Sequence, residues 1–96
     1  MDQFAAAAQS LEDDIAYFFP DDGITVEPIE TSAGNEYWVR AVPPELYSEV
    51  ERIIDEPRRG ASVLHDQPSE EFAGTVDLQV SFRNRPFGEL IEKEEW

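Results

Sequence analysis

The sequence contains no cysteine, a single histidine, a single lysine and no long apolar run. The lack of cysteine excludes a disulfide framework, a zinc–thiolate site and a cysteine nucleophile. A membrane-spanning helix needs about 18 consecutive apolar residues, and a secretory signal has basic residues where this chain has Asp2. We therefore expect a soluble, cytoplasmic protein that does not enter a membrane.

The chain is nevertheless rich enough in apolar residues to fold. Of its 96 residues, 41% are hydrophobic and 11% are aromatic, which is too much apolar material for a disordered acidic tail. The length suits one compact domain with one core. We therefore expect residues 1–96 to form a single acidic domain.

The first expected element is an α-helix over residues 4–19, ended by Pro20. Its apolar residues recur every three or four positions, at Phe4, Ala8, Leu11, Ile15 and Phe18. At about 100° per residue, consecutive acids spread across the solvent side of such a helix. We therefore expect Glu12, Asp13 and Asp14 to point outward while Ile15 and Phe18 point inward.

Two strands and a turn follow the first helix. Residues 24–30 are largely β-branched, and residues 36–42 alternate, so together they predict a hairpin. In the second strand we expect Tyr37, Val39 and Ala41 to face one way, and Trp38, Arg40 and Val42 the other. Pro28 has no N–H to donate, which predicts that the first strand lies at a sheet edge or is irregular at that point.

A second helix is predicted between two proline signals. Pro43 and Pro44 suit a first helical turn, and Pro57 ends the helix. Glu45, Glu49 and Glu56 would then lie in line along its solvated side. Successive members of such a row, four residues apart, are separated by about 6 Å, which is comparable with the spacing of phosphates along a nucleic-acid strand.

The rest of the chain adds the clearest strand. Residues 58–74 are predicted as mostly loop, with 62–64 as a candidate short strand, whereas 75–83 alternate strictly between apolar and polar residues. Residues 86–96 suggest a final helical turn or two. The pattern predicts an α+β fold, in which two helices pack on one face of a small antiparallel sheet of about three to four strands.

No arrangement of residues suggests catalysis or a cofactor. His65 is the only histidine, and no Gly-x-Ser-x-Gly sequence surrounds any serine. We expect His65 to be an exposed loop residue beside Asp66. The pairs Asp13–Asp14 and Asp21–Asp22 lack the alternating oxygen ligands of an EF-hand loop. We predict no catalytic residue, no cofactor and no dedicated metal site, and retain a weak divalent-cation site as an alternative.

The charge is the most informative feature. Twenty-two acidic residues stand against six arginines and Lys93, for a net charge of −15. Such a charge repels nucleic acid and anionic membranes, so we expect no direct binding to either. The arginines of 58–59 and 83–85 are expected to neutralise carboxylates within the fold. A basic protein surface is the natural partner, and Trp38 or Trp96 is a candidate anchor for it.

In charge and length the chain resembles the DNA-mimic proteins, a functional class that includes many phage-encoded inhibitors of restriction and CRISPR systems. The resemblance implies an inhibitor that occupies the nucleic-acid groove of a basic, nucleic-acid-binding protein. The residues expected to bind this partner are Glu12, Asp13, Asp14, Asp21, Asp22, Glu45, Glu49, Glu56 and Trp38.

A second explanation of the charge is environmental. Few lysines and many acids are also typical of proteins from salt-adapted organisms, in which acidity serves solvation and says nothing about partners. The sequence leaves open which explanation holds, and also whether the protein is a monomer or a homodimer.

Overall fold

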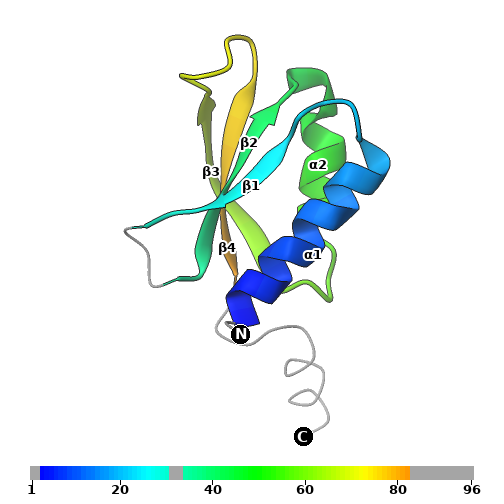
Figure 1. Ribbon diagram of the computed structural model, residues 1–96, viewed down its shortest axis with the longest axis vertical. Coiled ribbons are helices and arrows are strands. Elements are labelled where there is room, and N and C mark those ends of the chain that lie inside the picture. Colours follow the sequence, from blue (N-terminus) through cyan, green and yellow to red (C-terminus); the bar gives the residue numbers. More distant parts are fainter. Residues whose placement is uncertain (1–2, 31–33, 83–96) are drawn as a thin grey trace, which may run out of the picture.

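The computed structural model describes residues 3–30 and 34–82, which form two helices and a four-stranded antiparallel sheet (Figure 1). The elements are, in order, α1 (Gln3–Phe18), β1 (Thr25–Pro28), β2 (Glu36–Val42), the 3-10 turn η1 (Pro44–Leu46), α2 (Tyr47–Ile54), β3 (Ala61–Pro68) and β4 (Val76–Phe82). The strands lie side by side in the order β1-β2-β4-β3. The predicted α+β fold is confirmed. The helical turns expected over 86–96, Trp96 and the arginines of 83–85 lie outside the described residues.

Both helices cover the same face of the sheet, where the core lies (Figure 1). Helix α1 contributes Ala8, Leu11 and Ile15 to the core, and α2 contributes Val50 and Ile54. The sheet supplies the remaining members, which are Tyr37, Val39, Val42, Ala61, Leu78, Val80 and Phe82. Burial of these apolar side chains stabilises the fold by roughly 25 cal/mol for each Å² removed from water.

The end of α1 differs from the expectation. Phe18 is 61% exposed, whereas Phe19 is partly buried and packs against the core. The N–H of Phe19 donates to the carbonyl of Ile15 at 2.8 Å, so Phe19 lies one turn after Ile15 and continues the buried stripe. The prediction that Phe18 points inward is therefore wrong.

A β-bulge changes the faces of β2. The pairing between β2 and β4 shifts between Val39 and Val42, and Ala41 adopts a left-handed conformation with φ of 64°. A bulge inserts one extra residue, so Val42 joins the core instead of sharing a face with Arg40. The strict alternation predicted for 36–42 is wrong at this point. The N–H of Ala41 donates to Oδ1 of Asp77 at 3.1 Å, which fixes the bulge.

Two further expectations need correction. Residues 61–68 form strand β3, not a loop with a strand at 62–64, and a register shift between Val63 and His65 interrupts the alternation that would have indicated it. His65 is exposed as expected, but on a strand. Helix α2 spans only Tyr47–Ile54. Glu45 therefore lies in η1 and Glu56 beyond the helix, so the predicted row along one helix axis is wrong.

Candidate partner-binding surface

The strand pairing brings three separate loops to one end of the sheet. Thr25, the first residue of β1, pairs with Arg40 near the end of β2. Val76, the first residue of β4, pairs with both Val42 and Pro68. The α1–β1 turn, η1 and the β3–β4 loop therefore lie at the same end of the molecule, as Figure 1 shows. The α2–β3 turn lies at the opposite end.

These loops carry a group of exposed carboxylates, which we call the acidic end. Two come from the α1–β1 turn, one from η1, one from the first turn of α2 and two from the β3–β4 loop. The members are Asp21, Asp22, Glu45, Glu49, Glu70 and Glu71. Four of them are among the residues predicted from the sequence. The sequence analysis missed Glu70 and Glu71. Only the strand pairing places their loop, which joins β3 and β4, beside the α1–β1 turn and η1.

Arg40 is the only basic residue at this end within residues 3–30 and 34–82, and three carboxylates surround it. Its guanidinium lies 3.1 Å from Glu71, 3.4 Å from Glu27 and 3.5 Å from Asp77. The hydrogen bond with Glu71 is the largest of the causes that raise the pKa of Arg40, and partial burial opposes it. Arg40 also lies 5.9 Å from the centre of the Phe72 ring. Because Arg40 is fully paired, the acidic end keeps its negative potential.

Exposed aromatic rings accompany the carboxylates. Tyr17 is 79% exposed and Phe18 is 61% exposed, and their rings meet edge to face with centroids 5.0 Å apart. Asp21 and Asp22 follow them in the next turn. Phe72, which is 44% exposed, lies in the β3–β4 loop. Aromatic residues dominate the binding energy of many protein interfaces, so these rings and the carboxylates together form the candidate docking surface.

The sequence offers one signal for these rings. Tyr17, Phe18 and Phe19 are consecutive at the end of a helix, and successive residues there point about 100° apart. They cannot all face the core. Periodicity favoured Phe18 as the inward residue, and the structure instead places Phe19 there.

Two of the predicted acids of α1 make contacts within the fold. Oε2 of Glu12 accepts the N–H of Val26 at 3.2 Å, which places this side chain against β1. Asp14 forms an ion pair with Arg59 of the α2–β3 turn. The expectation that all three acids of this segment spread over the solvent side is therefore wrong for Glu12. Arg59 neutralises a carboxylate within the fold, as predicted.

The remaining predicted residues are distributed over the surface. Asp13 is exposed, and its Oδ1 accepts a hydrogen bond from Gln9 at 3.0 Å. Trp38 lies on the sheet face opposite the helices, half-buried in a hollow of about 250 Å³ that Glu70 also lines. Trp38 thus borders the acidic end. Glu56 lies at the opposite end, in the α2–β3 turn.

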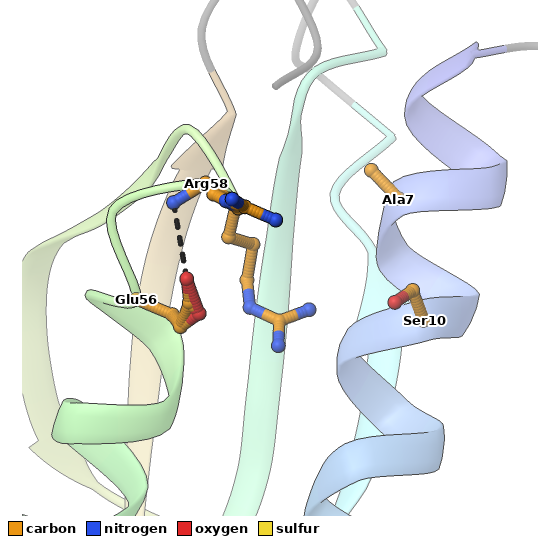
Figure 2. A pocket seen from close by; sticks show the side chains of 5 residues that line it. Ala7, Ser10, Glu56 and Arg58 are labelled. Carbon is orange, nitrogen blue, oxygen red and sulfur yellow. Dashed lines mark hydrogen bonds between the residues drawn. The ribbon is translucent and has the colours of Figure 1, made fainter. Parts of the chain in front are cut away.

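The opposite end contains a second hollow, of about 180 Å³, between α1 and the α2–β3 turn (Figure 2). Ala7 and Ser10 of α1 line one side. On the other side the N–H of Arg58 donates to Oε1 of Glu56 at 3.2 Å. Arg59 also lines this hollow, and its Nε donates to the carbonyl of Ile53 at 3.1 Å. Nothing here resembles a nucleophile with its base.

Within residues 3–30 and 34–82, no three histidine, aspartate or glutamate side chains group closely enough to hold a metal ion. In the same residues, no helix is both long and apolar enough to cross a bilayer.

The fold and the surface together define the class: a small α+β domain with helices on one face of its sheet and an acidic, aromatic surface at one end. Comparisons of the chain with protein-family models, with curated proteins and with solved structures gave no match.

Proposed function

We propose that this protein binds and inhibits, or masks, a basic protein whose own ligand is a nucleic acid. The observation that carries the proposal is the acidic end. Exposed carboxylates from three loops lie there beside the exposed Tyr17 and Phe18, and the only described arginine among them is already paired. The proposal needs no catalytic residue and no cofactor.

The physical basis is electrostatic steering followed by anchoring. A cluster of one charge sign raises the rate of association with a surface of the opposite sign. Charge-assisted hydrogen bonds between carboxylates and arginine then hold the complex. Aromatic rings that enter an apolar pocket supply binding energy that carboxylates alone do not.

The first test compares charge reversal at the two ends of α2. The variant Glu45→Lys/Glu49→Lys changes the acidic end, and the control Asp55→Lys/Glu56→Lys changes the opposite end by the same charge. All four residues are exposed. We expect the first variant to weaken partner binding by about tenfold or more, equivalent to about 1.4 kcal/mol, and the control to change it far less. Circular dichroism checks that both variants fold.

The partner comes from capture with a tagged copy of the full chain in its native host. The proposal expects a basic protein whose nucleic-acid ligand competes with this chain for binding. A captured protein that binds nucleic acid equally well with and without this chain would contradict inhibition. Equal loss of affinity in the two reversal variants would contradict the assignment of the acidic end.

A further inference from the structure

The two edges of the sheet differ in how they are closed. At the β1 edge, the N–H of Val26 points away from β2 and donates to Glu12. The next outward position, two residues along, is Pro28, which has no N–H. Edge strands that keep free N–H groups are templates for another strand, so the β1 edge is protected against strand addition.

At the opposite edge of the sheet, formed by β3, the N–H of Asp66 has no such protection. The N–H of Ser69 donates to the carbonyl of Thr75 at 2.9 Å, so the backbone of Ser69 faces β4. Backbone groups alternate in direction along an antiparallel ladder, and the register from Asp66 to Pro68 is regular. The N–H of Asp66 therefore points away from the sheet.

The same reasoning applies on the other side of the bulge in β3. The N–H of Phe82 donates to the carbonyl of Asn35 at 2.8 Å, so Phe82 faces away from β3. Its partner Ala61 and, two residues on, Val63 therefore turn their N–H groups outward. Within residues 3–30 and 34–82, no hydrogen bond from Val63 or Asp66 N–H to an acceptor outside the β3–β4 ladder is present.

The side chains around this edge favour a basic occupant. By register, the side chain of Asp66 shares the helix-covered face with Leu78. Helix α2, which carries Tyr47 and Glu51, packs against β3. Burial is the largest cause that raises the pKa of Tyr47, and the carboxylates of Asp66 and Glu51 raise it further. Asp66 on β3 and Glu51 on the helix packed against it thus both lie on the helix-covered side of the sheet. Leu64, 54% exposed, offers an apolar contact at the bulge.

We propose that the β3 edge binds an extended basic segment of a partner protein, which adds as a further strand beside Val63 and Asp66. The inference rests on the proposed function for the basic character of the partner, and it names the conformation that is bound. Main-chain hydrogen bonds supply affinity in this mode of recognition, and side chains at alternate positions supply specificity. Basic side chains on one face of the segment meet Asp66 and Glu51, and apolar ones on the other face meet Leu64.

The test uses the full chain and the synthetic peptide Lys-Val-Lys-Val-Lys-Val. Amide hydrogen exchange is measured by NMR with and without the peptide. We expect the N–H groups of Val63 and Asp66 to exchange rapidly in the free protein and at least about tenfold more slowly with saturating peptide, because each then donates to the added strand. There are two control peptides. One has the same sequence with alternate backbone amides N-methylated, and the other is Glu-Val-Glu-Val-Glu-Val. Neither should protect the N–H groups of Val63 and Asp66.

Two variants separate this edge from the acidic end. Asp66→Lys should abolish the protection of the Val63 and Asp66 amides by the peptide, whereas Asp22→Lys, beyond the opposite edge of the sheet, should leave that protection in place at saturating peptide. If Asp22→Lys weakens peptide binding as much as Asp66→Lys does, and the Val63 and Asp66 amides stay unprotected, the edge is not the binding site. That result would leave the acidic end as the site that binds basic segments. Amides already protected in the dilute free monomer would show that the chain covers its own edge. Protection that grows with protein concentration would assign the edge to a second copy, and either result overturns the proposal.

Discussion

At the scale of single residues, Asp77 is a buried carboxylate that holds the bulge of β2. Its Oδ1 accepts the N–H of Ala41, and its Oδ2 lies 3.5 Å from Nε of Arg40. The conformation of Ala41, with φ of 64°, is one that residues other than glycine rarely adopt. The carboxylate therefore compensates for an unfavourable backbone and for a partly buried guanidinium.

We expect Asp77→Ala to lower the free energy of unfolding by about 2 kcal/mol, because it removes a charged acceptor from a buried N–H. The matched control is Glu71→Ala, which removes another carboxylate from Arg40. Glu71 is 62% exposed, and exposed ion pairs contribute at most about 1 kcal/mol. Urea unfolding of both variants measures the difference. Equal losses would show that the bulge does not depend on Asp77.

Tyr47 gives the fold a dependence on alkaline pH. Burial, and then the carboxylates of Asp66 and Glu51, raise the pKa of Tyr47 above the ordinary value of 10.0. The folded protein thus holds the phenol proton more tightly than the unfolded chain does. This contribution to stability is fully present below pH 10.0, and it is lost as the pH rises through the folded-state pKa of Tyr47.

The prediction is that the free energy of unfolding falls as the pH increases above about 10, and falls less steeply in Tyr47→Phe. Urea unfolding at several alkaline pH values measures both slopes. The phenylalanine variant keeps the ring, so packing is nearly unchanged. Parallel slopes in the two proteins would contradict a raised pKa at Tyr47.

At the scale of elements, the end of α1 carries one buried and one exposed apolar side chain. Ile15 is 1% exposed and belongs to the core, whereas Phe18 is 61% exposed. We expect Ile15→Ala to lower the free energy of unfolding by about 2–5 kcal/mol, as truncation of a large buried side chain does. Phe18→Ala should lower it by less than about 1 kcal/mol. A large loss of stability in Phe18→Ala would mean that this ring packs inward.

Phe18→Ala should instead affect the partner. If Phe18 anchors the complex at the acidic end, its truncation weakens binding by more than about 1 kcal/mol, or roughly fivefold or more. Isothermal titration calorimetry with the captured partner measures this change. Gln9→Ala, which removes an exposed, uncharged side chain earlier on α1, is the control. Unchanged affinity in Phe18→Ala would restrict the interface to the carboxylates.

At the scale of the whole molecule, the net charge of −15 has two explanations, a recognition surface and adaptation to salt, and the salt dependence of stability distinguishes them. The thermal unfolding midpoint is measured at low salt and at about 1 M KCl, where the screening length falls to about 3 Å. The proposed function expects a protein that is folded at low salt and only modestly stabilised by KCl. A protein that unfolds without high salt would make its acidity a response to habitat, and the inhibitor proposal would be withdrawn.

Much of the fold could be predicted because local patterns report burial directly. The periodicity of Ala8, Leu11 and Ile15 gave α1, and the alternation of 75–83 gave β4, because each pattern matches the geometry of one element with one buried face. The errors lie where that geometry is interrupted. Bulges in β2 and β3 break the alternation, so Val42 was assigned to the wrong face and most of β3 to a loop.

The sequence by itself therefore determined the fold class, the buried stripes of the helices and the large excess of negative charge. Only the tertiary structure decided which carboxylates share a surface. Antiparallel pairing brings Asp21, Glu45 and Glu70 to one end of the sheet, although each lies in a different loop. It also directs Glu12 to the backbone of β1. Composition and periodicity depend on neighbours along the chain, whereas a surface depends on strands that are distant in sequence and adjacent in space.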